Sequence, residues 1–306
     1  MKAAWHFVLN EGELSMLQIN AERQVQRLVT SRLLLSTARA SQTAVAALNF
    51  YNAETLLAHV RAANALQASI ILQTTESTID YLGLPLIVAM ARAAADQMEK
   101  PVALHLDHGG SFELALRCIE AGYTSVMFDG SRLSLSENCR ETRRVVELAH
   151  ANGVSVEGEL GHVAHNDEST TADQVGFYTL PEDALRFVTE TEVDALAIAI
   201  GTAHGFYKGE VRIDFDRLSQ IRNVIGETAL VLHGGSGVPE ELLRQAIVNG
   251  ISKINFGTEL KNAFTLAVKK SLASNDDIDL RRTFAPAIAA VEQVSLAKIR
   301  VCSRPR

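Results

Sequence analysis

Short apolar runs alternate with longer amphipathic segments from about residue 44 onward, and this alternation constrains the fold more than any other feature of the chain. Several amphipathic segments end in glycine where a helix should stop, as at Gly122, Gly153 and Gly250. The eight runs that we interpret as buried strands are Val45–Leu48, Ser69–Gln73, Val102–Leu106, Ser125–Phe128, Ser155–Glu159, Ala195–Ile200, Ala229–Leu232 and Ser252–Phe256. A strand followed by a helix, eight times over, predicts an α/β fold of the closed (β/α)8 (TIM) barrel type. An open doubly wound sheet is the main alternative, but it seldom places polar residues at the ends of so many strands.

The length of 306 residues suggests two domains, yet a (β/α)8 barrel fills about 250 residues as one unit. We therefore predict a single barrel domain over residues 33–306 and an N-terminal extension over residues 1–32. The extension contains a predicted helix, Ala21–Leu35. A second helix, Ala285–Ile299, is predicted as a C-terminal tail outside the repeat.

Composition and charge exclude several classes of protein. Hydrophobic residues make up 47% of the chain, enough for a large core, and a formal charge of −7 argues against a nucleic-acid-binding protein with a broad basic surface. The three cysteines, Cys118, Cys139 and Cys302, form no CxxC pair, which indicates neither a disulfide framework nor a cysteine zinc site. No apolar run is long enough for a membrane span, and no signal peptide is evident. We expect a cytoplasmic protein that binds neither nucleic acid nor membranes.

Three histidines follow apolar runs at equivalent places: His108, His204 and His233. Strands of a barrel deliver the residues at their C-terminal ends to one mouth, where active sites lie. Three imidazoles there could share one divalent metal and leave a coordination position open for substrate. Asp107, beside the first histidine, is placed to transfer a proton at the polarised centre. Any one of these histidines alone could be an ordinary core residue; three in equivalent places favour a common site.

Two glycine-rich loops follow the last two strands, His233–Gly237 and Asn255–Thr258, and each precedes a helix. Backbone N–H groups at helix starts bind phosphate, and barrels often place phosphate after strands seven and eight. One such loop is usually only a turn, whereas two at these strands favour a phosphate site.

These residues resemble a known family, the class II, metal-dependent ketose-bisphosphate aldolases. The likeness runs from about Leu33 to about Val301 in consistent order. The five motifs that carry it are His105–Gly109, Val156–Gly161, Ala199–Gly205, Leu232–Gly237 and Lys253–Lys261. The resemblance implies reversible cleavage of a ketose 1,6-bisphosphate to dihydroxyacetone phosphate and glyceraldehyde 3-phosphate through a zinc-stabilised enediolate.

The resemblance also assigns roles to matching positions. It implies one zinc ion (Zn2+) per subunit, held by His108, His204 and His233. Asp107 matches the residue that exchanges a proton with the aldehyde or the C4 hydroxyl. Asp129 and Glu159 match carboxylates that hold the metal in an alternative position in some members. The positions that match substrate and phosphate contacts are Asn49, Thr75, Gly205, Gly234, Gly235, Ser236, Asn255, Gly257, Thr258 and Arg281.

Arg281 matches an arginine that reaches the distal phosphate across a dimer interface, so the resemblance implies a homodimer or homotetramer. A monovalent cation, Na+ or K+, near the phosphate loops is also usual in the family. The phosphorylated sugar is the only other partner that we expect.

The sequence departs from the family pattern in two places. The family follows Glu-Leu-Gly with a mobile loop that carries Gly-Gly and then a catalytic glutamate, but here Ala164-His165 replaces the two glycines, and Asp167 or Glu168 must supply the acid. Gly257 replaces an aspartate that is typical of fructose-bisphosphate enzymes and thereby favours tagatose 1,6-bisphosphate. Two alternatives stay open: an aldolase that joins dihydroxyacetone phosphate to a different aldehyde, or a catalytically impaired barrel that binds metal and phosphate as a partner subunit.

Overall fold

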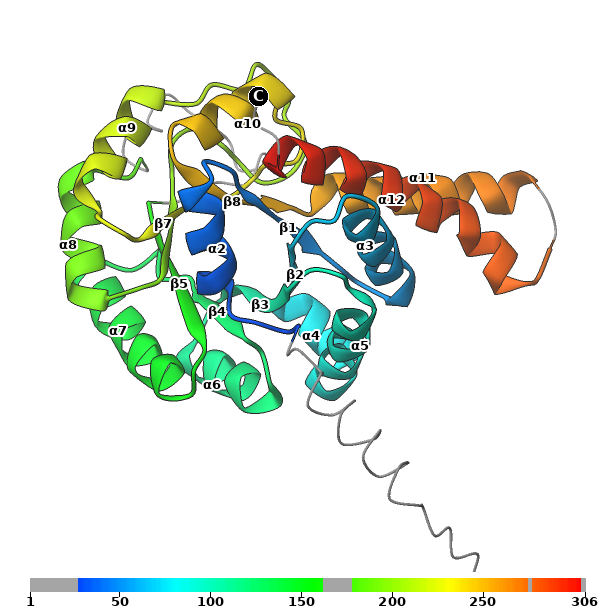
Figure 1. Ribbon diagram of the computed structural model, residues 1–306, viewed down its shortest axis with the longest axis horizontal. Helices are drawn as coiled ribbons and strands as arrows, with labels where there is room; N and C mark the ends of the chain where they lie inside the picture. Colours follow the sequence, from blue (N-terminus) through cyan, green and yellow to red (C-terminus); the bar gives the residue numbers. More distant parts are fainter. Residues whose placement is uncertain (1–26, 162–177, 275–276, 304–306) are drawn as a thin grey trace, which may run out of the picture.

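The computed structural model describes residues 27–161, 178–274 and 277–303 and shows a closed barrel of parallel strands. Each strand pairs with its neighbour in the chain, and β1 pairs with β8 to close the ring (Figure 1). The strands are β1 (Val45–Asn49), β2 (Ile70–Thr75), β3 (Val102–Gly109), β4 (Ser125–Phe128), β5 (Ser155–Leu160), β6 (Ala195–Ile198), β7 (Ala229–Leu232) and β8 (Ile251–Phe256). The predicted (β/α)8 barrel is confirmed.

Helices surround the strands and bury their outer faces, which is why nearly every strand residue is buried. They are α3 (Ala53–Ala65), α4 (Glu76–Leu82), α5 (Leu84–Gln97), α6 (Phe112–Ala121), α7 (Leu135–Ala151), α8 (Pro181–Thr191), α9 (Phe215–Val224), α10 (Glu240–Val248), α11 (Thr258–Ser274) and α12 (Leu280–Ser303). In the part of the chain that is described, no single helix has the length and composition to cross a membrane. One pair there, α4 and α5, has them when the two helices are taken together, but the pair is bent by 98°.

One further helix, α2 (Ser31–Ala40), closes the N-terminal mouth of the barrel (Figure 1). Its Leu34 and Leu35 pack against small residues inside the strands, such as Ala47 and Ala197. The helix predicted over Ala21–Leu35 is wrong over residues 27–30, because this stretch is extended and pairs with the start of β3 through the Val29 N–H. The helix begins only after Thr30, whose hydroxyl caps it. The division predicted at residue 33, inside α2, stays a prediction.

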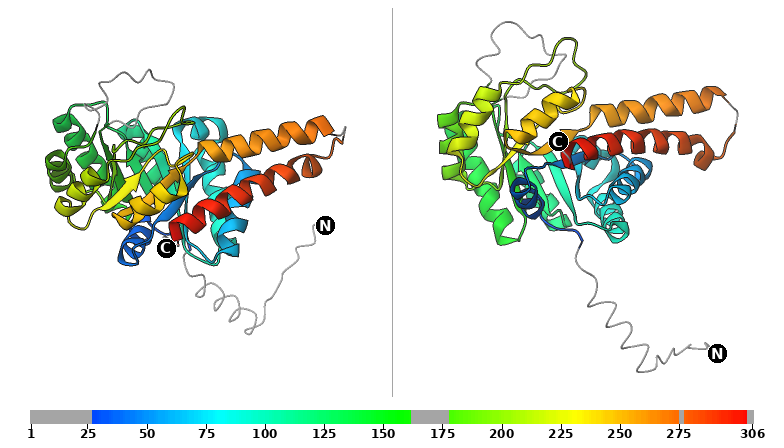
Figure 2. Two further views of the ribbon diagram at one scale, coloured as in Figure 1. Left: turned by 90° about the horizontal axis from the view of Figure 1, so that it is seen from above. Right: turned by 45° about the horizontal axis from the view of Figure 1, so that its top comes forward.

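At the other end of the chain, α11 and α12 form an antiparallel hairpin that projects from the barrel (Figures 1 and 2). The last part of α12 returns to the barrel, where the Ala44 N–H donates to the Cys302 carbonyl. His59 of α3 lies 2.9 Å from the Ser295 hydroxyl and also contacts the Asn49 carbonyl. The helix predicted over Ala285–Ile299 is therefore the middle of a longer helix that packs beside the active-site end of β1.

Candidate active site

A cavity of about 530 Å³ opens at the C-terminal ends of the strands. Most of the predicted site residues line it. They are Asn49, Thr75, Asp107, His108, Asp129, Glu159, His204, Gly205, Gly234, Ser236, Asn255, Gly257 and Thr258. Six strands contribute residues at or directly after their ends, whereas β6 and β7 contribute through the loops that follow them, which supply His204, Gly205, Gly234 and Ser236. The barrel thus gathers residues that are more than 200 positions apart in the chain at one mouth.

The remaining predicted residues do not line the cavity, for three different reasons. His233 and Gly235 are buried just below the cavity wall. Arg281 lies at the far end of the projecting hairpin, 91% exposed, where it forms an ion pair with Asp279, so a single chain does not bring it to the site. Asp167 and Glu168 lie outside the described residues. The roles predicted for these three residues stay predictions.

Three imidazole rings converge at the bottom of the cavity. His108, His204 and His233 each offer a ring nitrogen within 4.8 Å of the other two, and their ring centroids are 4.7 to 5.9 Å apart. His108 Nε2 and His233 Nδ1 lie only 3.0 Å apart. Three imidazoles arranged in this way suit a borderline divalent cation such as zinc, with a side open to the cavity.

The backbone at the first of these histidines is strained. His108 has φ +54°, a left-handed conformation that costs a residue with a Cβ about 1 kcal/mol or more. The next residue has to be glycine, because a Cβ on Gly109 would lie 2.4 Å from the Met127 carbonyl oxygen. The strain coincides with a register shift between β3 and β4, an irregularity of the kind that changes the direction of a side chain.

Two carboxylates lie next to Nδ1 of the His108 ring. Asp129 Oδ2 lies 2.8 Å from Nδ1 and Glu159 Oε2 lies 3.8 Å from it. Burial alone would lower the pKa of His108, but Asp107, Asp129 and Glu159 raise it to about 10. A carboxylate on Nδ1 leaves Nε2 to face the other imidazoles, the usual support for a metal ligand. His108, Asp129 and Glu159 also form a second cluster of possible ligand atoms, where the sequence predicted the alternative metal position.

Three amide groups fix the Asp107 carboxylate. Asn49 and Gln73 donate to Oδ2 at 3.0 and 3.1 Å, and Asn255 donates to Oδ1 at 3.0 Å. Burial would raise the pKa of Asp107, but the charges around it, His108 foremost, lower it to about 2. The carboxylate is therefore ionised at neutral pH and held beside the histidines. The sequence analysis missed Gln73, because an amide inside an apolar strand carries no distinctive pattern.

A buried ion pair lies beneath the histidines in the barrel interior. Lys253 Nζ is 2.7 Å from Glu157 Oε2, and both side chains are almost fully buried. Glu157 Oε1 is 2.9 Å from His233 Nε2 and so leaves Nδ1 of that ring as the atom that faces His108. His105 contacts Lys253 on its other side, and burial together with Lys253 lowers its pKa to about 3. This cluster connects the candidate metal ligands to the core.

The loops after β6, β7 and β8 form one continuous wall. A Cβ on Gly234 would lie 2.4 Å from the Ala203 carbonyl oxygen, and the residue has φ +68°, so only glycine fits there. The Tyr207 hydroxyl joins the two loops, accepting from the Ala203 N–H and donating to the Gly234 carbonyl. The Ser236 hydroxyl accepts from the Gly257 and Glu259 N–H groups at the start of α11. Glycines and a helix start on one wall match the predicted phosphate site.

Three further residues that the sequence analysis did not select line the cavity: Tyr51, Arg132 and Lys261. Lys261 Nζ lies 5.7 Å from the centre of the Tyr51 ring, beside the phosphate loops. Arg132 lies in the loop after β4, across the cavity. Each is one or more residues beyond a strand end, where the strand pattern no longer indicates which side chains face the mouth. The net result is a site with cationic side chains on two walls.

Comparisons with known proteins give the family and the fold of the chain. Residues 29–305 match the family model "Fructose-bisphosphate aldolase class-II". The YdjI aldolase from Escherichia coli K12 is 32% identical, with a TM-score of 0.79 over 90% of this chain and 97% of that one. A putative fructose-1,6-bisphosphate aldolase from Coccidioides immitis is 30% identical, with a TM-score of 0.78 over 89% and 96%. Fructose-bisphosphate aldolase from Campylobacter jejuni, at 21% identity and a TM-score of 0.75 over 91% and 97%, shares the fold. The chain belongs to the class II fructose-bisphosphate aldolase family.

Proposed function

We propose that this protein is a zinc-dependent aldolase that reversibly cleaves tagatose or fructose 1,6-bisphosphate to dihydroxyacetone phosphate and glyceraldehyde 3-phosphate. The observation that carries the proposal is the convergence of three imidazoles beside a fixed, ionised Asp107 in a cavity that the glycine-containing loops after β6, β7 and β8 also line. The C. immitis relative, named as a putative fructose-1,6-bisphosphate aldolase, supports the substrate class.

Cleavage of a carbon–carbon bond next to a ketone requires stabilisation of negative charge at the ketone oxygen. A divalent metal held by His108, His204 and His233 would supply it as a Lewis acid when bound. The loops at Gly234, Ser236 and Gly257 would hold one phosphate of the substrate through backbone N–H groups and so orient the ketone toward the histidines.

Asp107 would accept the proton of the C4 hydroxyl during cleavage and return it during condensation. Its carboxylate is suited to this because the three amide donors fix its position and leave it ionised. A second acid, Asp167 or Glu168, would exchange the proton at the dihydroxyacetone phosphate carbon.

We also propose a homodimer or homotetramer. The α11–α12 hairpin exposes Leu266, Leu272, Ile278 and Leu280, and these apolar side chains would be buried by a second copy. In such an assembly Arg281 of one copy would be available to the phosphate site of another.

Cleavage assays with tagatose 1,6-bisphosphate and fructose 1,6-bisphosphate, run side by side, test the proposal. EDTA should abolish cleavage and added zinc should restore it, and the ratio of the two rates identifies the preferred sugar. Absence of cleavage of either sugar by protein that holds stoichiometric zinc would refute the proposed substrate. Condensation of dihydroxyacetone phosphate with another aldehyde would then identify the first alternative, and its absence would favour the impaired barrel.

A further inference from the structure

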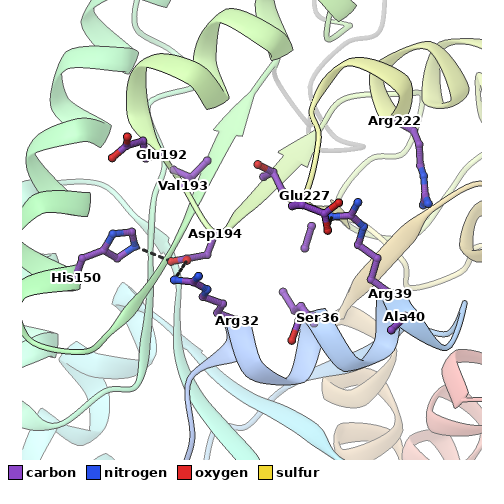
Figure 3. A pocket seen from close by; sticks show the side chains of 13 residues that line it. Arg32, Ser36, Arg39, Ala40, His150, Glu192, Val193, Asp194, Arg222 and Glu227 are labelled. Carbon is purple, nitrogen blue, oxygen red and sulfur yellow. Dashed lines mark hydrogen bonds and ion pairs between the residues drawn. The ribbon is translucent and has the colours of Figure 1, made fainter.

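A second cavity, of about 610 Å³, lies at the end of the barrel opposite to the active site. Its walls are α2, the C-terminal end of α7, and the segments that lead into β6 and β7 (Figure 3). The cavity has the volume of a small-molecule site. Three arginines, Arg32, Arg39 and Arg222, line it.

Arg39 lines this cavity, and in the part of the chain that is described the acid paired with its guanidinium is an exposed one. Its Nη2 donates to the Gly226 carbonyl at 2.7 Å, which fixes the guanidinium in place. Nη1 is buried and makes no hydrogen bond of good geometry among the described residues, but it forms an ion pair. The nearby acid is Glu227, 3.2 Å away, with a side chain that is 99% exposed. Because the Glu227 carboxylate is in solvent, the pair contributes little energy, and Glu227 can turn away from Arg39 when another anion arrives.

Arg222 reaches the same region from α9 (Figure 3). Its side chain lies across Gly250, where a Cβ would be 2.3 Å from Nη1, so the glycine makes room for the guanidinium. Gly250 has φ +113°, a conformation that other residues rarely adopt. Among the described residues, Arg222 forms no ion pair. Arg222 and Arg39 also line a smaller adjoining cavity together, which shows that they are neighbours.

The acids in the cavity leave these two arginines undercompensated. Asp194 is nearly buried and already accepts from the Val156 N–H, with His150 2.9 Å and Arg32 3.6 Å away. Glu192 is paired with Arg143 outside the cavity. Of the acids in the described part of the chain that line this cavity, only the exposed Glu227 therefore opposes the charges of Arg39 and Arg222.

We propose that this cavity binds a small molecule that carries a phosphate group. Guanidinium groups donate in a planar fork that matches oxyanions, and two positive charges match the double charge of a phosphate monoester better than the single charge of a carboxylate. The site is separate from the catalytic cavity and does not depend on the reaction that is catalysed there.

Calorimetric titration of the full-length chain with inorganic phosphate, in chloride buffer of constant ionic strength, tests the proposal. Arg222→Gln and Arg39→Gln should each weaken one phosphate-binding phase about tenfold or more, since each removes a charge-assisted donor. Glu227→Gln should strengthen the same phase several-fold, because it removes the competing anion. Arg244→Gln is the matched control: this arginine pairs with Glu240 on α10, outside the cavity, and its loss should change nothing.

The arginine variants should weaken phosphate binding and Glu227→Gln should strengthen it. These opposite effects distinguish this site from the phosphate loops of the active site, which contain none of these residues. Titrations of the Arg222→Gln and Glu227→Gln variants that both match the wild type would overturn the proposal. Because Arg222 is exposed and pairs with no acid in residues 27–161, 178–274 and 277–303, its replacement tests the site even where Arg39→Gln does not fold. Acetate should bind at least about tenfold more weakly than phosphate; equal binding would overturn the assignment to phosphate.

Discussion

The buried pair between Lys253 and Glu157 should be energetically coupled far more strongly than ion pairs on the surface. Two unit charges 2.7 Å apart attract by about 6 kcal/mol at an effective dielectric constant of about 20. Removal of one partner leaves the other charge buried, which typically costs about 3–5 kcal/mol. We therefore expect Lys253→Met and Glu157→Gln each to reduce the free energy of unfolding by about 3–5 kcal/mol.

The double variant Lys253→Met, Glu157→Gln removes both charges and should cost less than the sum of the two single variants by at least about 2 kcal/mol. Urea unfolding of the four proteins gives this coupling energy. The matched control is the pair of Arg143 and Glu147, at 2.9 Å but exposed, for which the same cycle should give at most about 0.5 kcal/mol. Additive effects of Lys253→Met and Glu157→Gln would refute the view that this pair acts as a unit.

Three further outcomes follow from the site and the core. Asp107→Asn should lower kcat by about 100- to 10,000-fold with little change in KM, and an unchanged kcat in steady-state assays would remove Asp107 from the proton transfer. His204→Ala should lose the bound metal together with activity, as measured by elemental analysis; full metal content would contradict the three-histidine site. Burial lowers the pKa of His59 to about 4, below its unfolded value of 6.5, so the unfolded chain binds more protons between these values. The free energy of unfolding should therefore fall as the pH drops from 6.5 toward 4, and in the His59→Gln variant this fall should be smaller by about 3 kcal/mol. Urea unfolding at a series of pH values measures the difference, and an identical pH dependence of variant and wild type would contradict the expectation.

The barrel and much of its mouth were predictable because both depend on local pattern. Strand ends are readable from apolar runs, and a parallel barrel brings all of its strand ends together, so residues as distant as Asn49 and Thr258 could be assigned to one site. Strand bounds were less accurate: β6 ends at Ile198, two residues before the predicted end, since the chain turns there without continuing the ladder.

Residues beyond the strand ends were harder to predict. Tyr51, Arg132 and Lys261 reach the cavity from loops and a helix start, where no fixed periodicity relates sequence to direction. The N-terminal helix was misplaced because Leu28 pairs with Val102, a contact between residues 74 positions apart that no local pattern can indicate. At residues 27–30 this tertiary contact outweighs the local preference for a helix.

The helix α2 constrains the order in which the chain can fold. The Ser31 hydroxyl lies 2.8 Å from the hydroxyls of Ser125 and Ser155, so it bonds to residues 94 and 124 positions later. During synthesis the ribosome releases α2 well before either partner exists, and β8, which it also contacts, comes later still. Contacts across such long separations form slowly. We expect α2 to dock late, after the strands have closed, so hydrogen-exchange protection in α2 should appear after protection in β3 and β4 during refolding.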